Sequence, residues 1–168
     1  MLQDDLCKEW LKLVVRSVQK YIDTIVKKAL DEDLKPHGDI TTNLISFKNK
    51  KAKAQIIAKQ NGVIAGLDFC KTAFKLLGKE TIFISKVKDG SKVRKNKIIA
   101  EIKAKTKTIL SAERTALNFL NHASGIATLT YQFKQKVNKK TKICCTRKTT
   151  PNLRLLEKYA VKKGGGFN

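Results

Sequence analysis

Apolar residues recur at spacings of three and four from Trp10 to Leu30, a pattern that predicts an amphipathic helix. This apolar stripe consists of Leu11, Val14, Val15, Val18, Ile22, Ile25, Val26 and Ala29. Residues 31–43 are predicted to form a loop. Pro36 and Gly38 interrupt any helix there, and Asp39 can turn or cap the backbone.

Between residues 44 and 104 the period shortens to that of β-strands. Strands are predicted at 44–48 and 52–59, with a hairpin turn at Asn61-Gly62. A short helix is predicted for residues 66–77, closed by Gly78.

Residues 81–104 alternate most clearly, and Asp89-Gly90 divides them by a turn. Lys105 and Lys107 flank what reads as a polar connector. We therefore expect residues 1–110 to form an α+β domain in which helices pack on an antiparallel sheet.

From Ser111 the pattern is helical again, with Leu117, Leu120 and Ala123 on one face. Ser124-Gly125 is expected to interrupt this helix, and a second helix is predicted for about residues 126–136.

The last residues predict one strand–loop–helix unit. Residues 141–145 form a short apolar strand, and a helix runs from Pro151 to Lys163 with Thr150 as its cap and a glycine run at its end. One such unit cannot close a sheet, and a β/α barrel needs about 200–250 residues. Residues 111–168 are therefore predicted to begin an α/β barrel that is incomplete in this sequence.

The chain has 168 residues and a net charge of +22, yet only five of its 36 basic residues are arginines. The lysines are spread along the whole chain, whereas a dedicated nucleic-acid surface concentrates arginines and aromatic residues. We interpret most lysines as a solvated surface and expect no specific nucleic-acid partner. Binding to nucleic acid that survives high salt would favour the opposite interpretation.

Cysteine usage and hydropathy indicate the compartment. The cysteines form no CxxC pair, so neither a zinc site nor a disulfide framework is expected. They are Cys7, Cys70, Cys144 and Cys145. Free thiols indicate a reducing, cytoplasmic location. The N-terminus lacks the layout of a signal peptide, and no apolar run approaches the ~18 residues of a membrane span, so no membrane partner is expected.

The segment from Thr146 to Pro151 is the first candidate site. It follows a predicted strand and precedes a predicted helix, where α/β proteins bind ligands and where unpaired N–H groups favour anions. Arg147 adds a planar fork suited to a carboxylate or phosphate, and Lys148 adds a point charge. From the spacing alone, a capped loop with two solvated charges explains the pattern equally well.

A second candidate lies in residues 111–128, where Arg114, Asn118 and His122 follow each other at intervals of four. A polar stripe on an apolar helix lines a site or an interface, or it is a partly exposed face with local hydrogen bonds.

These segments carry a resemblance to a known family. Residues 145–168 are similar to the Thr-Arg-Lys segment of quinolinate phosphoribosyltransferases, and residues 112–128 to their signature helix. Residues 38–42 and 61–66 also match the N-terminal domain of that family. The resemblance implies transfer of a phosphoribosyl group from phosphoribosyl pyrophosphate to quinolinate with Mg²⁺, releasing pyrophosphate and CO₂ and giving nicotinate mononucleotide for NAD biosynthesis.

The resemblance also implies an assembly and residue roles. The family forms homodimers, or assemblies of dimers, in which the N-terminal domain of one subunit covers the barrel mouth of the other. Arg147 would hold a quinolinate carboxylate, Lys148 would face the phosphoribosyl donor and Thr146 would line the pocket. Arg114 would reach into the partner's site. No catalytic residue and no metal ligand is assigned.

The chain departs from the family pattern at two positions and at its end. Cys145 stands where many relatives have Asp, and Asn152 where many have Gly. The family continues beyond the glycine run with His-Arg and later Lys, Glu and Asp residues. We therefore expect the 168 residues alone to be catalytically inactive.

Two alternatives remain open at this stage. A relative associated with molybdenum transport shares the architecture, although the Thr149-Thr150-Pro151 run favours the quinolinate enzyme. Residues 88–102 resemble the hairpin of lipoyl or biotinyl carrier domains, a non-catalytic binding module, but they lack the lysine-bearing tip of such domains.

Overall fold

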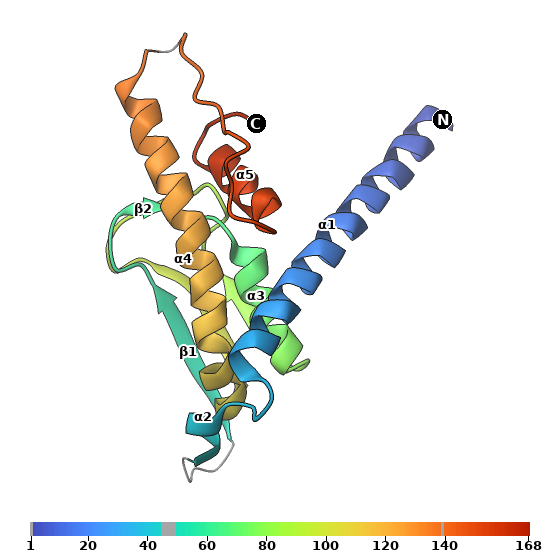
Figure 1. Cartoon of the computed structure of the whole chain (residues 1–168), viewed down its shortest axis with the longest axis vertical. Helices are drawn as coiled ribbons and strands as arrows, with labels where there is room; N and C mark the ends of the chain where they lie inside the picture. The colour runs from blue at the N-terminus through green and yellow to red at the C-terminus, as the bar shows by residue number, and fades with distance from the viewer. Residues whose placement is uncertain (1, 45–49, 139) are drawn as a thin grey trace.

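The protein is arranged around one long helix, α4 (Thr106–Lys136), against which most other elements pack (Figure 1). The computed structural model describes residues 2–44, 50–138 and 140–168, with side chains from residue 16 onward. The remaining elements are α1 (Leu2–Leu34), α2 (Ile40–Leu44), β1 (Lys51–Ile57), β2 (Gly62–Val63), α3 (Leu67–Leu77), β3 (Ile82–Ser85), β4 (Lys92–Val93), β5 (Ile98–Lys105) and α5 (Arg154–Lys163).

The sheet is antiparallel, as predicted. Its three strands have the order β1-β5-β3, and β2 and β4 form a separate two-stranded ribbon. Side chains of a strand alternate between two faces. In β5, Ile102 and Ala104 are buried, whereas Lys103 and Lys105 are exposed. One face of the sheet therefore packs on the core and the other faces solvent, which confirms the predicted α+β layering.

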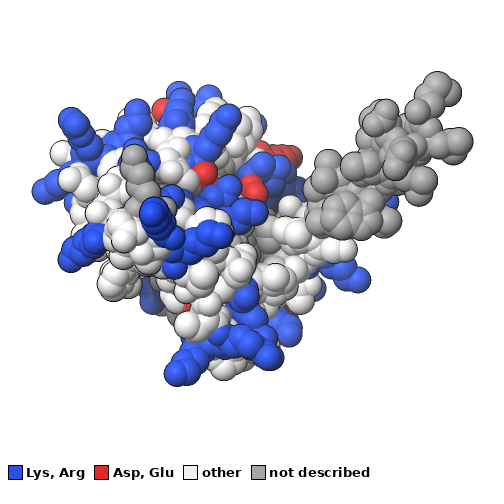
Figure 2. All heavy atoms as spheres, turned by 90° about the horizontal axis from the view of Figure 1, so that it is seen from above, with Lys and Arg blue, Asp and Glu red and all other residues white. Residues whose placement is uncertain are grey.

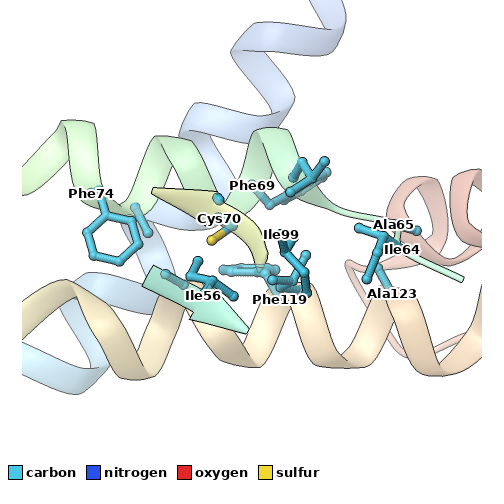
Figure 3. Close-up of a cluster of buried hydrophobic side chains, with 14 of the residues drawn as sticks. Ile56, Ile64, Ala65, Phe69, Cys70, Phe74, Ile99, Phe119 and Ala123 are labelled. Carbon is cyan, nitrogen blue, oxygen red and sulfur yellow. The ribbon is translucent and has the colours of Figure 1, made fainter. Parts of the chain in front are cut away.

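The core is aliphatic with a few phenylalanines between α3, α4 and the sheet (Figure 3). Phe69 of α3 and Phe119 of α4 lie with ring centroids 5.4 Å apart. Cys70 has no exposed surface, and burial raises the pKa of its thiol to about 12. This thiol is an apolar filler with no nucleophilic character at neutral pH.

The predicted break at Ser124-Gly125 is wrong, because α4 is continuous. Tertiary contacts hold the helix where local propensity would interrupt it. The hydroxyl of Ser124 accepts from Ala65 N at 3.1 Å and lies 3.2 Å from Ala65 O. Gly66 has φ of +95°, and a Cβ there would come within 3.1 Å of Ala123 Cβ, so only a glycine permits this close approach. The proposed division between residues 1–110 and 111–168 falls inside α4 and stays a prediction.

The N-terminal predictions are partly confirmed. The first helix ends at Leu34, with Ile22 and Val26 buried, but Val18 is 51% exposed and is not a core residue. The part of the predicted stripe before residue 16 lies outside the described side chains.

The predicted loop at 31–43 instead contains the end of α1 and the short helix α2. Asp39 caps α2 by accepting from Thr42 N at 2.9 Å. The strand predicted for residues 44–48 is wrong at Leu44, which ends α2, and its other residues lie outside the described part.

The short helix 66–77 and the strands within 81–104 are confirmed as α3, β3 and β5. The hairpin at Asn61-Gly62 is wrong, because β1 pairs with β5 and β2 pairs with β4. The side chain of Asn61 accepts from Lys95 N at 2.9 Å instead. The polar connector around 105–107 is also wrong, since β5 leads directly into α4 at Thr106.

The C-terminal unit differs from its prediction at both ends. Residues 141–145 contain no regular strand, and their pairing is a single parallel bridge between Cys144 and Phe167. The last helix begins at Arg154, with Leu153 at its N-cap position, and not at Pro151 after a Thr150 cap. The glycine run has a packing reason, because a Cβ at Gly164 would lie 2.3 Å from Ala127 O of α4.

Candidate functional site

The loop of residues 146–153 carries the candidate cations and is held by short-range bonds of its own. Thr146 Oγ1 accepts from Lys148 N at 3.1 Å, and Thr149 N donates to Arg147 O at 3.0 Å. Leu153 N donates to Thr150 O at 3.1 Å, which closes the turn before α5. These bonds fix the backbone that carries Arg147 and Lys148.

Asn152 adopts a left-handed conformation in this loop, with φ of +65°. Glycine adopts it freely, and asparagine is among the few other residues that tolerate it. The replacement of a family glycine by Asn152 therefore preserves the turn.

Side chains of α5 and α1 bind the loop directly, and one of α4 supports the α5 side chain. Glu157 of α5 accepts from Thr150 N at 3.2 Å through one carboxylate oxygen, and its other oxygen lies 3.0 Å from His122 Nε2 of α4. Tyr21 of α1 donates its hydroxyl to Asn152 O at 2.7 Å. The loop is thus tied to elements that are far apart in the sequence.

The pKa values of the anchors agree with these contacts. Burial alone would raise the pKa of Glu157, but the bonds from Thr150 and His122 outweigh it, and the pKa is lowered. Burial raises the pKa of the Tyr21 phenol, and the negative charge of Glu157 adds to that effect. Glu157 is therefore a carboxylate and Tyr21 a neutral hydrogen-bond donor at neutral pH.

Arg147 and Lys148 are exposed, and neither forms an ion pair within the described residues. Thr146 is exposed beside them. The N-terminus of α5 does not adjoin them as the sequence predicted, since residues 150–153 intervene and the acid of its first turn, Glu157, already faces Thr150. The positive charge of this loop therefore comes from its two side-chain cations and not from the helix end.

Arg114 lies elsewhere on α4. It is exposed, and its positive charge is a minor contribution to the lowered pKa of Asp39, whose main causes are hydrogen bonds from Thr42. Ser111 Oγ also donates to Asp39, at 2.7 Å. Eight residues separate Arg114 from His122, or about 12 Å along a helix axis. No described contact joins Arg114 to the loop 146–153 within the same chain.

Three hollows on the surface, of about 710, 580 and 450 Å³, are not lined by Thr146, Arg147 or Lys148. The hollow of about 580 Å³ lies nearest the loop and includes Asn118, His122 and Leu153. It also includes Glu32 and Asp33, whose charges repel a dicarboxylate. The polar stripe predicted on α4 is therefore divided: Asn118 and His122 line this hollow, whereas Arg114 does not.

Sequence reasoning missed the anchors Glu157 and Tyr21. Both bind backbone groups of the loop, and a backbone group can belong to any residue type. The sequence therefore contains no matching side chain that would indicate either contact. It also missed Asp89, which accepts from Gly66 N at 2.9 Å and from the Tyr159 hydroxyl at 2.7 Å and so joins α3 to α5. A separation of 70 residues leaves no local pattern for the latter bond.

Within the described residues, no three side chains of His, Cys, Asp or Glu gather closely enough to hold a metal ion. The helices of the described part include none with both the length and the apolar character needed to cross a membrane.

Two family models match the chain. The model described as quinolinate phosphoribosyl transferase, N-terminal domain, matches residues 39–124, and the model of the C-terminal domain matches residues 126–168.

Curated relatives agree with this match. A probable carboxylating nicotinate-nucleotide pyrophosphorylase of Methanocaldococcus jannaschii is 44% identical over 153 residues, which cover 89% of this chain and 52% of the relative. The corresponding protein of Bacillus subtilis is 43% identical over 132 residues, covering 78% of this chain and 45% of the relative.

Solved structures are also similar. NadC from Streptococcus pyogenes superposes with a TM-score of 0.83 at 42% identity, over 88% of this chain and 53% of that one. The nicotinate-nucleotide pyrophosphorylase of Francisella tularensis gives a TM-score of 0.84 at 37% identity. This chain spans about half the length of the relatives it matches. With both family models matched in order and this fold shared, the chain belongs to the quinolinate phosphoribosyltransferase family.

Proposed function

We propose that the protein to which this chain belongs transfers the phosphoribosyl group of phosphoribosyl pyrophosphate to quinolinate, with loss of CO₂, to form nicotinate mononucleotide. The relatives that support this proposal are named as nicotinate-nucleotide pyrophosphorylases or quinolinate phosphoribosyltransferases. The observation that carries it is the loop 146–153, where Arg147 and Lys148 are exposed and form no ion pair with the described residues, on a backbone held by Glu157 and Tyr21.

The chemistry of the substrates fits these cations. Quinolinate carries two adjacent carboxylates, and removing them from water requires fixed positive charge. Arg147 has the planar fork that grips a carboxylate in two places, and it would hold the carboxylate that remains while its neighbour leaves as CO₂. Lys148, a point charge on a flexible stem, would face the phosphates of the donor. Thr146 would line the same pocket with its hydroxyl.

Arg114 is proposed to act in a homodimer or an assembly of dimers. It is exposed and has no described contact with its own chain's loop, which agrees with a role in the partner's site. Ser111, three residues before it on α4, donates a side-chain hydrogen bond of 2.7 Å to Asp39.

Mg²⁺ is proposed to enter with the pyrophosphate of the donor. The described residues offer no cluster of metal ligands, so no step is assigned through the ion here. Cytoplasmic location also stays a proposal, based on free thiols such as Cys70 and Cys144.

The full-length product of the gene tests the proposal. We expect pyrophosphate release that requires both quinolinate and phosphoribosyl pyrophosphate. The alternative, a relative associated with molybdenum transport, predicts no quinolinate binding. Failure to bind quinolinate in calorimetry would therefore reject the proposed reaction.

We further propose that the 168 residues alone do not catalyse the reaction, because the relatives are about twice as long and this part supplies cations without an assigned acid or metal ligand. Pyrophosphate release by the 168-residue chain above background would contradict that statement.

A further inference from the structure

The solvent face of the sheet brings lysines into direct opposition. In the antiparallel register of β1 and β5, Lys51 lies opposite Lys105 and Lys53 lies opposite Lys103. Opposed residues of an antiparallel pair point to the same face, with Cβ atoms about 4.5–5.5 Å apart. All four residues are exposed, whereas Ala104, which lies between Lys103 and Lys105, is buried.

A fifth lysine and a surface hollow complete this cluster, which we call the lysine face (Lys51, Lys53, Lys79, Lys103 and Lys105). The five lysines line a hollow of about 450 Å³ beside the turn after α3. Gly78, Thr81 and Thr108 also line it, as do Ala52 and Ala104, which lie on the other face of their strands, so the hollow is at the end of the sheet and adjoins both of its faces. Glu80 is the one acidic residue among those that line it.

The positive charge of the lysine face is only partly balanced within the described residues: Glu101, two residues from Lys103 on β5, interacts electrostatically with Lys103. None of its five lysines forms an ion pair there. The strand on the other side of β5 places Ile82, 54% exposed, opposite Lys103 where an acid could have been. Further along the same face the pattern reverses: Glu101 lies opposite Gln55 and is 2.9 Å from Lys86 Nζ. Like charges placed directly opposite each other destabilise a sheet.

Biased composition alone explains scattered lysines, and the view in Figure 2 shows lysines and arginines distributed over the visible face without one stripe. On the sheet, however, two successive cross-strand pairs are both lysine pairs, and all four of these lysines line one hollow. A bound anion would convert this repulsion into attraction.

We propose that the lysine face binds a compact polyphosphate, either free or carried by a nucleotide. Lysine binds phosphate as a point charge. The hollow is lined by no arginine and no aromatic residue, which disfavours nucleic acid, because base stacking and arginine contacts dominate such surfaces. None of residues 146–153 lines this hollow, so within one chain it is distinct from the loop that carries Arg147 and Lys148.

Titration of the 168-residue chain with inorganic tripolyphosphate tests the site at fixed ionic strength. The variant Lys53→Gln/Lys103→Gln removes one opposed pair. The control Lys27→Gln/Lys28→Gln removes the same charge from an exposed part of α1. Two lost charge contacts should weaken binding about tenfold in the first variant. The control should change it less than about twofold, because only distant, screened charges are lost. Equal weakening in both variants, or no binding by the wild type, overturns the site.

Thermal unfolding gives a second test, because the order of the unfolding temperatures of wild type and double variant should depend on whether anion is present. Without anion, Lys53→Gln/Lys103→Gln should unfold at the same or a higher temperature than the wild type, since repulsion is relieved. Saturating tripolyphosphate should raise the unfolding temperature of the wild type more than that of the double variant. Glu80→Gln should tighten binding. Equal increases in unfolding temperature for the wild type and the double variant would contradict the proposal. Comparison of ATP with tripolyphosphate shows whether the site requires a nucleoside.

Discussion

The loop 146–153 and the lysine face are both positively charged, but they are built in different ways. The loop presents two cations, Arg147 and Lys148, on a backbone that Glu157 and Tyr21 anchor from behind. The lysine face presents five cations on flexible stems, four of them placed by the register of β1 and β5 and the fifth, Lys79, by the turn after α3. Anchored charge selects a ligand by geometry, whereas charge on flexible stems selects by total charge.

This difference makes the loop dependent on the packing of the whole molecule. Its anchors come from α1, α4 and α5, and Asp89 fixes α5 to the start of α3 through Tyr159. The lysine face depends mainly on the sheet and on the turn after α3. Substitutions behind the loop should therefore alter both stability and binding, whereas those on the lysine face should barely alter stability.

The largest effect is expected at Arg147. In the full-length product, Arg147→Ala should weaken quinolinate binding by about 2–5 kcal/mol, because one partner of a desolvated charge pair is lost. Isothermal titration measures the change. Arg94→Ala, which removes an exposed arginine elsewhere, is the matched control and should leave the affinity unchanged. An affinity unaffected by Arg147→Ala would remove this residue from the site.

Tyr159→Phe tests the scaffold behind the loop. The Tyr159 hydroxyl donates to Asp89 at 2.7 Å, and burial together with that carboxylate raises the pKa of the phenol. Loss of a hydrogen bond to a charged group should reduce the free energy of unfolding by about 1.5–3 kcal/mol. Urea unfolding of the 168-residue chain measures it.

Tyr131→Phe is the control for that experiment, because the Tyr131 hydroxyl accepts a hydrogen bond from the exposed Lys92 on the surface. Its cost should be well below that of Tyr159→Phe. Equal costs for the two variants would show that the link between α3 and α5 adds no stability.

Glu157→Ala should lower the free energy of unfolding by about 1–2 kcal/mol, since Thr150 N loses its acceptor. Glu157→Gln keeps an acceptor and should cost less. The pKa of Glu157 is lowered from its ordinary 4.5, so the contribution of the carboxylate is present above pH 4.5 and disappears as the pH falls below that value. The free energies of unfolding of the wild type and of Glu157→Ala should converge as the pH falls through this range. A difference between them that does not change with pH would contradict the role of the charge.

The smallest effect is expected on the lysine face. Lys103→Glu places an acid opposite Lys53 and should stabilise the sheet by about 0.2–1 kcal/mol in the absence of anion. Chemical denaturation at low salt detects this gain, which high salt should abolish. Destabilisation by Lys103→Glu at low salt would mean that the opposed lysines do not repel.

The parts of the fold that follow a local period were predictable from the sequence. Three such patterns predicted their elements correctly: the apolar stripe around Ile22 and Val26, the helical pattern of 66–77 and the alternation in β5. The failures occurred where long-range contacts decide. Ser124 bonds to Ala65 and keeps α4 continuous, and β1 pairs with β5 and not with the nearer β2.

The site was only partly predictable for the same reason. A local motif indicated Arg147 and Lys148, but their anchors bind backbone atoms and leave no second motif. The departure at Asn152 became interpretable only with its φ of +65°. The lysine face was invisible before the register of Lys53 and Lys103 was known.

A crystal structure of the full-length product with quinolinate tests the central claim most directly. The account predicts a carboxylate of quinolinate about 2.7–2.9 Å from the guanidinium of Arg147, with the loop backbone still bonded to Glu157. Quinolinate bound elsewhere, with Arg147 left in solvent, would contradict it.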